Sequence, residues 1–258
     1  MEFSAELLVQ GASQYFLPLA RLSAFMLAAP IFGSRLIATR VRLLLALLVT
    51  LLLVPSLPEL PKVEGFGLST LLLVVQQTLI GFVAGFSMQV AFQVVVLGGQ
   101  FIAMKMGLGF ASMNDPSNGV TVTIVSQYYL MLVTLLFVVG DGHLLLLRIL
   151  AESFYSLPIG SGWVPAALLW DLVATGSWMF GAALLLALPV LTSLMIVNIS
   201  FGVMGRSAPQ MNIFTVGFPI TLILGMFLIW FGFTTFLGNY NQFMQEGFGL
   251  LRHLLNVS

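Results

Sequence analysis

The ionisable side chains that could catalyse a reaction are few and scattered along this chain. The aspartates Asp115, Asp141 and Asp171 lie in separate segments, and the histidines His143 and His253 lie far apart. Intramembrane proteolysis needs paired aspartates, or a serine and a histidine, that face each other within spans. The sequence contains neither arrangement, and it contains no nucleotide-binding motif. We therefore expect no catalytic residues and a protein that is not an enzyme.

Metal, redox and carrier chemistry also find little support in the sequence. The chain has no cysteine, which excludes thiol nucleophiles and cysteine-based metal sites, and neither histidine has ligand-like neighbours. We therefore predict no metal and no cofactor. A proton-driven carrier usually places a carboxylate or a histidine at mid-span. Asp171 is the only carboxylate inside a long apolar run, but it lies near the start of that run beside Trp163, Trp170 and Trp178, which indicates an interfacial position.

Amide side chains form a stripe where the chain is otherwise apolar. At 100° per residue, a continuous helix places the following residues within an arc of about 80°: Gly85, Gln89, Gln93, Val96 and Gln100. Glutamine is costly against lipid, so this face needs protein or water beside it. The stripe either forms hydrogen bonds between helices that fix assembly, or it lines a water-filled path. Gly81 and Gly85 add a G-x-x-x-G spacing that lets another helix backbone approach closely.

The segment MKMGLGFASMNDPSNGVT, residues 104–121, interrupts the apolar sequence with polar residues, glycines and a proline. Its apolar side chains are Met104, Met106, Phe110 and Met113. Its glycines, which permit backbone angles that other residues avoid, are Gly107, Gly109 and Gly119. Asn114-Asp115-Pro116 is a strong turn signal, because proline disfavours a helical residue before it. A plain connector is normally short and hydrophilic, whereas methionine fills irregular gaps, so the segment is either a movable apolar plug or a connector.

The composition of the whole chain identifies the environment of these residues. The chain has 258 residues, of which 59% are hydrophobic and 7% are charged, with a mean hydropathy of +1.08. Soluble domains carry about 25% charged residues, so this chain is predicted to be an integral membrane protein whose helices pack in lipid or against other apolar subunits. Its formal net charge is zero, which gives no reason to expect nucleic acid as a partner. Glu2 and Glu6 stand where a signal peptide needs positive charge, so we expect an uncleaved N-terminus.

Apolar runs at about 13–32, 41–58, 68–100, 120–140, 163–200 and 211–238 predict about six spans. Two of these runs are too long for a simple crossing of the ~30 Å hydrocarbon core. The 68–100 run would be roughly 50 Å long as a helix. The 163–200 run contains Pro189, which is expected to kink the helix or to divide it in two. Long tilted helices or bent helical hairpins in surroundings of protein would satisfy both runs.

The connections between the runs carry few signals of topology. The segment from Gly140 to Gly162 predicts a turn, a short amphipathic helix and a stop, with Arg148 and Glu152 spaced to form an ion pair. The arginines after the first run, Arg35, Arg40 and Arg42, indicate a cytoplasmic loop. Over the whole chain, the excess of basic residues on one side of the membrane is small. It places the N-terminus outside the cytoplasm.

Three stretches together resemble one known family. They are GLGFASMNDPSNG from Gly107, DGHLLLLRILAESFYSLPIG from Asp141 and GRSAPQMNIFTVGFPITLILG from Gly205, and the early RLSAFMLAAPIFGSR also matches. The chain resembles the FliR family of flagellar export-gate proteins, whose virulence-system relatives serve injectisomes. The resemblance extends over essentially the whole chain. It implies an all-α membrane protein of long, kinked apolar helices and helical hairpins, with a single export-gate domain over residues 1–258.

The resemblance also implies a function and partners. Members are core subunits of the flagellar type III secretion export gate, in the bacterial inner membrane and the flagellar basal body. With FliP and FliQ, and with FlhB and FlhA nearby, they form a closed ring that admits unfolded flagellar proteins to the export channel. Much of this ring lies above the usual membrane plane, inside the basal-body ring. Protein in place of lipid would account for the overlong apolar runs and for the weak charge asymmetry.

The resemblance assigns roles to two groups of residues. The loop at 107–119, with the residue before it, matches the pore plug of the family: Met106, Gly107, Leu108, Gly109, Phe110, Ala111, Ser112, Met113, Asn114, Asp115, Pro116 and Gly119. Arg206, Pro209 and Gln210 also match the family, and they form either a plain turn with a snorkelling arginine or a contact with a neighbouring subunit. The predicted subunit-packing residues are therefore Gly81, Gly85, Gln89, Gln93, Gln100, Arg206, Pro209 and Gln210.

Three other functions remain open at this point. The chain could be the equivalent subunit of a virulence injectisome, with effector proteins as cargo. It could be an autonomous carrier of small solutes or ions, although such a carrier needs a charged binding site at mid-span, preferably repeated in two halves. It could also be a scaffold without a transport role, in which case any flexible linker could replace the loop.

Overall fold

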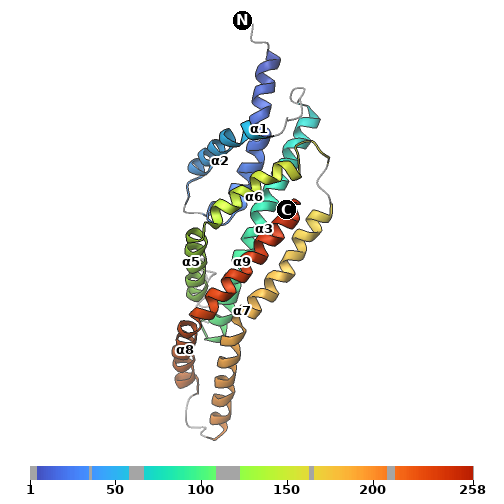
Figure 1. The fold of residues 1–258 in the computed structure, drawn as a ribbon. Coiled ribbons are helices and arrows are strands. Elements are labelled where there is room, and N and C mark those ends of the chain that lie inside the picture. The colour runs from blue at the N-terminus through green and yellow to red at the C-terminus, as the bar shows by residue number, and fades with distance from the viewer. Residues whose placement is uncertain are drawn as a thin grey trace. The chain divides into compact units, whose positions relative to one another are not determined.

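The chain folds into helices. The computed structural model of the protein describes residues 5–34, 37–57, 67–108, 123–162, 166–207 and 213–257, and these residues contain no strand. The prediction of an all-α membrane protein is therefore confirmed. In chain order (Figure 1) the elements are α1 (Ala5–Ala28), α2 (Thr39–Leu53), the 3₁₀ turn η1 (Val54–Ser56), α3 (Leu68–Lys105), α5 (Ile124–Val139), α6 (Gly142–Ser156), α7 (Ala166–Ser207), α8 (Ile213–Phe231) and α9 (Phe233–Leu255).

The two overlong apolar runs are long single helices. Helix α3 has 38 residues and α7 has 42, which correspond to about 57 Å and 63 Å at 1.5 Å per residue. Pro189 lies inside α7, so of the two effects expected there, a kink or a division into two helices, the division is not observed. Proline provides no N–H to the turn before it. Downstream of it, Ser193 Oγ donates to the Pro189 carbonyl at 2.9 Å and Thr192 Oγ1 donates to the Leu188 carbonyl at 2.9 Å.

Two other apolar segments are broken. The turn and short helix predicted between Gly140 and Gly162 are present: Asp141 has a left-handed φ of 54° and α6 follows it. The predicted ion pair is also present, with Arg148 Nε 2.8 Å from Glu152 Oε1. The 211–238 run, which the sequence predicts as one span, instead bends by 61° at the break between α8 and α9.

The described residues contain fewer candidate spans than the sequence predicts. Three helical segments have the length and hydropathy to cross a membrane, namely Thr39–Ser56, Leu68–Lys105 and Ala166–Ser207. The number rises to five if α5 with α6, and α8 with α9, each count as one broken span. The sequence predicts about six, because it also counts the first apolar run. That run lies largely in α1, which is not among the candidate spans.

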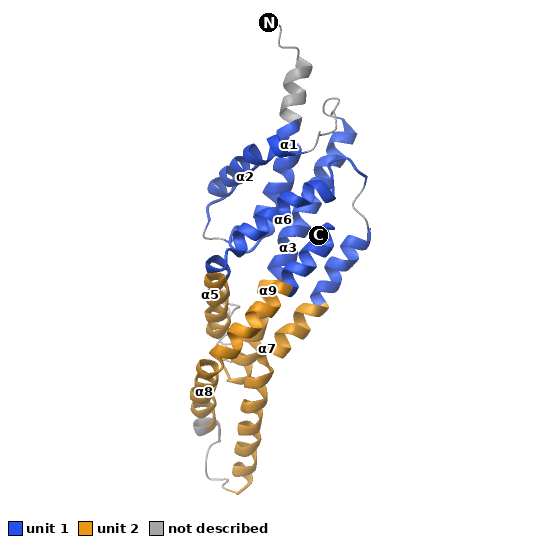
Figure 2. Cartoon of the chain, viewed as in Figure 1, with its two compact units in different colours: residues 1–90, 137–176, 246–258 blue, residues 91–136, 177–245 orange. Residues whose placement is uncertain are grey.

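The chain divides into two compact units, which are coloured in Figure 2. Unit 1 comprises Met1–Val90, Phe137–Gly176 and Glu246–Ser258, and unit 2 comprises Ala91–Leu136 and Ser177–Gln245. Helices α3, α5, α7 and α9 contribute residues to both units. The single export-gate domain over residues 1–258 stays a prediction.

Glycines allow close helix packing within each unit. In unit 1, a Cβ built on Gly81 would overlap the Arg21 carbonyl oxygen, and a Cβ on Gly85 would lie 2.7 Å from the Ala29 nitrogen. The G-x-x-x-G pair therefore faces the backbone at α1 and at the residue that follows this helix. In unit 2, α3 contacts α7 and α5 through Gly98 and Gly99, which are buried, and neither of them stands out in the sequence.

Candidate functional site

The predicted plug is described at its attachment to α3 and at the start of α5. Met106, Gly107 and Leu108 are described, and residues 109–122 are not. The following predicted plug residues therefore lie outside the described residues: Gly109, Phe110, Ala111, Ser112, Met113, Asn114, Asp115, Pro116 and Gly119. The described residues are those at its two ends, up to Leu108 and from Thr123.

Gly107 terminates α3 and turns the chain out of the helix. Its φ is +85°, in the left-handed region that glycine enters without steric cost. The Leu108 N–H donates to the Ala103 carbonyl at 3.0 Å, and the Gly107 N–H donates to the Met104 carbonyl at 3.1 Å. These two bonds form a Schellman motif, which satisfies carbonyls at the end of the helix. A side chain on Gly107 would also lie 2.7 Å from the Phe218 ring of α8.

Met106 anchors the same end of the loop in the interior of unit 2. Its side chain is fully buried. A Cβ built on Gly225 of α8 would lie 2.6 Å from Met106 Cγ and 2.7 Å from its sulfur. The missing side chain at Gly225 therefore provides the space that Met106 fills. We call this contact the Met106 seat.

The other end of the loop is held at the start of α5. Thr123 Oγ1 lies 3.0 Å from Ser126 Oγ, and the Ser126 N–H donates to Thr123 Oγ1 at 3.4 Å. This is the geometry of a side chain that caps a helix N-terminus. Ser126 is fully buried, and a Cβ built on Gly99 of α3 would lie 2.8 Å from Ser126 Cα. Both ends of the loop are thus fixed to helices of unit 2.

The predicted subunit-packing residues occupy different environments. Gly85 and Val96 are buried, Gln89 and Gln100 are half-buried, and Gln93 is exposed. The glutamines of the stripe thus remain accessible on α3. Arg206 is exposed near the end of α7, whereas Pro209 and Gln210 lie outside the described residues. The packing role of the whole set stays a prediction.

A buried arginine that the sequence-based reasoning does not single out lies at the centre of unit 1. The side chain of Arg21 has no exposed surface. Its Nε donates to Gln77 Oε1 at 2.8 Å. Its Nη1 donates to the carbonyl and the hydroxyl of Ser153 at 2.9 and 3.1 Å, and its Nη2 donates to the Leu157 carbonyl at 2.8 Å. The guanidinium carbon also lies 4.1 Å from the centre of the Phe154 ring.

The environment of Arg21 joins α1, α3 and the C-terminal end of α6. Carbonyl oxygens at the end of a helix carry partial negative charge. They can therefore bind the guanidinium in the place of a carboxylate. One sequence signal could have identified this residue. Arg21 lies within the first apolar run, and an ionisable residue inside a span is costly unless it has partners.

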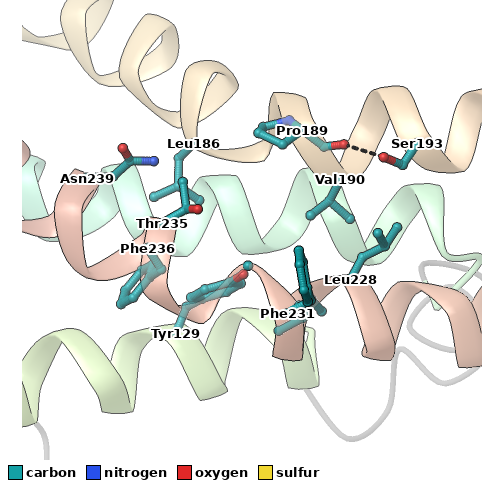
Figure 3. A pocket seen from close by; sticks show the side chains of 12 residues that line it. Tyr129, Leu186, Pro189, Val190, Ser193, Leu228, Phe231, Thr235, Phe236 and Asn239 are labelled. Carbon is teal, nitrogen blue, oxygen red and sulfur yellow. Dashed lines mark hydrogen bonds between the residues drawn. The ribbon is translucent and has the colours of Figure 1, made fainter.

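Unit 2 contains a cavity of about 340 Å³ beside the break between α8 and α9 (Figure 3). Its walls come from four helices, with Tyr129 on α5, Pro189 on α7, Phe231 at the end of α8, and Phe236 and Asn239 on α9. The rings of Tyr129 and Phe236 lie 5.1 Å apart. The lining has hydroxyl and amide groups but no charged side chain. The cavity can therefore hold an apolar group, but it offers no acid–base pair.

Ionisable residues elsewhere do not converge on a second site. Among the described residues, no group of three or more histidines, aspartates or glutamates could hold a metal ion. Asp171 is exposed on α7 beside Trp170, which is also exposed. An exposed carboxylate next to an exposed tryptophan fits the interfacial position predicted for this pair.

Comparisons with known proteins agree on one family. The profile of "Bacterial export proteins, family 1" matches residues 12–247. A protein described as "Flagellar biosynthetic protein FliR" from Pectobacterium carotovorum subsp. carotovorum is 40% identical over 226 residues, which cover 88% of this chain and 86% of that protein. The protein with the same description from Escherichia coli K12 is 38% identical over 229 residues, with 89% and 87% covered. One from Aquifex aeolicus is 30% identical, with 88% and 86% covered.

Proposed function

Because this chain belongs to the bacterial export proteins, family 1, we propose that it is a core subunit of the flagellar export gate, and that it forms with FliP and FliQ a closed pore for unfolded flagellar proteins. We propose further that the loop after α3 is the plug of this pore. The proposal makes the chain a conduit and not an enzyme. The energy for transport then comes from other components of the apparatus.

The attachment of the loop is the observation that carries this proposal. A plug must be held at its base while its tip can leave the pore. The base of this loop is held by the Schellman motif at Gly107, by the Met106 seat and by the cap at Thr123. A linker that only connects two helices has no need of a buried methionine seated on a glycine of a third helix.

The partners and location follow from the same proposal. FliP and FliQ complete the ring, FlhB and FlhA lie nearby, and the assembly occupies the inner membrane within the flagellar basal body. Similarity to proteins described as flagellar favours unfolded flagellar proteins over virulence effectors as the cargo. An autonomous carrier gains no support, because the described residues show no cluster of charged residues around the cavity of unit 2.

A shortened loop tests the plug directly. We would express the chain with FliP and FliQ, delete residues 110–118, and measure ion conductance or small-solute leakage across the membrane. This deletion retains Met106, Gly107 and Thr123, so both attachments remain. We expect leakage to rise while the three proteins still purify together, because the deletion removes the apolar residues that seal the pore.

A loop of unchanged length serves as the matched variant. Replacement of residues 110–118 by glycine and serine keeps the connection but removes Phe110 and Met113. We expect this variant to leak as well, since the seal depends on apolar contact. Intact assembly without leakage in both variants would show that the loop is a connector, and the plug proposal would then be wrong.

A further inference from the structure

Helix α2 divides its residues sharply between two faces. Ala46 and Thr50 are buried, and α2 packs against α1. The opposite face is exposed and entirely aliphatic. We call it the leucine face, and its residues are Val41, Leu43, Leu44, Leu47, Leu48, Leu51 and Leu52. Only 11% of the 18-residue span Thr39–Ser56 is buried within the chain, compared with 72% of an apolar 18-residue window of α3.

The leucine face lacks residue types that the buried surfaces of this chain contain beside leucine, such as Phe25, Met26 and Ala84. Close helix contacts in this protein use small residues, as at Gly81 and Gly85 against α1 and at Gly99 against α5. Helices in membranes associate through such small residues, because they allow backbones to approach. Protein interfaces are in addition enriched in aromatic residues and methionine. The leucine face has none of these residue types, whereas the small residues Ala46 and Thr50 of α2 point inward.

Two arginines near the start of α2 have separate roles. Arg42 is half-buried, and its guanidinium donates to the Phe32 carbonyl at 2.8 Å and to the Ser34 carbonyl at 3.0 Å. Arg42 therefore holds the turn between α1 and α2. Arg40 lies two residues earlier and is exposed. A basic side chain at the end of an apolar helix extends toward lipid headgroups, and it is attracted to anionic ones.

From this arrangement we propose that the leucine face of α2 is a lipid-binding surface in the assembled apparatus. The face contacts acyl chains, and Arg40 binds the headgroup of an anionic phospholipid at the end of the helix. The span Thr39–Ser56 has 18 residues, or about 27 Å as a helix, which is close to the ~30 Å hydrocarbon core. The occupant of this face is thus lipid and not a neighbouring subunit.

Photochemical crosslinking in the native assembly tests the acyl-chain contact. A benzophenone-bearing amino acid replaces Leu48 in the full chain. The variant is expressed in cells that lack their own copy of the gene for this protein. After illumination, we expect the chain to carry phospholipid adducts detectable by mass spectrometry. The matched control places the same amino acid at Val49, which is half-buried and not part of the leucine face, and which should crosslink within the chain. A discrete adduct of Leu48 with another protein would overturn the proposal, and so would the absence of any lipid adduct.

The role of Arg40 is tested with the same amino acid at Leu44, one turn from Arg40. The measured quantity is the ratio of phosphatidylglycerol to phosphatidylethanolamine among the lipid adducts. One basic residue near a membrane surface contributes about 1 kcal/mol, so Arg40→Gln should lower this ratio about fivefold. Arg40→Lys should retain the ratio because it retains the charge. An equal ratio in the parent chain and in Arg40→Gln would show that Arg40 binds no anionic headgroup.

Discussion

At the scale of single residues, Arg21 shows how this chain accommodates a buried charge. Its partners are carbonyl oxygens, a hydroxyl, an amide and an aromatic ring from α3 and the end of α6. The planar guanidinium donates in several fixed directions at once. A lysine has one compact charge at the end of its side chain and cannot reach these acceptors together. The position should therefore require arginine and not merely a positive charge.

We expect Arg21→Lys to lower the stability of the chain on the order of 2 kcal/mol, because a buried charge would lose most of its acceptors. Arg21→Met should cost no more than this, since it removes the charge together with the hydrogen bonds. Thermal unfolding of the full chain in detergent measures both variants. Arg252 is exposed on α9, so Arg252→Lys is the matched control and should leave the midpoint unchanged. A midpoint for Arg21→Lys equal to that of the parent would contradict this explanation.

At the scale of the elements, the end of α3 is positioned by α8. The Met106 seat joins a residue at the base of the loop to a glycine in the middle of another helix. Met106 Cγ lies near the root of its side chain, so the methionine cannot avoid a new methyl group on Gly225 without changing its rotamer or moving α3. The position of the loop base is therefore coupled to the packing of α8.

A double-mutant cycle measures this coupling. Gly225→Ala should destabilise unit 2 by about 1–3 kcal/mol through overpacking, and Met106→Ala should destabilise it by about 2–5 kcal/mol through the cavity it leaves. The double variant should be destabilised by at least 0.5 kcal/mol less than the sum of the two single variants, because the space left by Met106→Ala can hold the new methyl group at position 225. Unfolding midpoints provide the measurement. Gly181→Ala on α7, where nothing lies within 4 Å of the new Cβ, should have no such effect. Strict additivity would show that the seat does not couple the two helices.

At the scale of the whole molecule, the chain leaves surface that its own residues do not cover. Gln93 is exposed between buried neighbours of α3, and the large apolar side chains of Trp230 and Phe231 are 73% and 72% exposed. An exposed amide on an apolar helix needs protein or water beside it. The proposed ring of subunits provides both. The chain is thus expected to complete its surface by assembly.

Gln93→Leu separates assembly from folding. Gln93 is exposed within the chain. We therefore expect the substitution to change the free energy of unfolding of the isolated chain by no more than about 0.5 kcal/mol, so that the unfolding midpoint hardly moves. The amounts of FliP and FliQ that purify with the chain should fall, because the amide no longer bonds to a neighbour. Gln77→Leu provides the contrast: Gln77 is buried and accepts a bond from Arg21, so this change should lower the midpoint itself. Unchanged recovery of partners with Gln93→Leu would remove the glutamine stripe from the subunit interface.

The features that the sequence determines by itself are those set by composition and by local spacing. An apolar content of 59% with 7% charged residues requires a membrane environment. The short helix α6 and the Arg148–Glu152 pair follow from spacings of a few residues along the chain. For the two longest apolar runs, the sequence left a long helix and a bent hairpin both open. The end of α3 is also anticipated by the sequence, since Gly107 follows a long apolar run and allows the left-handed turn that closes the helix.

The features that only the tertiary structure decided join residues far apart in the chain. Arg21 bonds to Gln77 and Ser153, which are 56 and 132 residues away, and Met106 is seated on Gly225. The break between α8 and α9 divides an apolar run that local periodicity reads as continuous. The same limit applies to α2, where only packing shows which residues face α1 and which form the leucine face. Hydropathy reports that a residue avoids water, but lipid and a packed helix satisfy it equally, so only the fold distinguishes them.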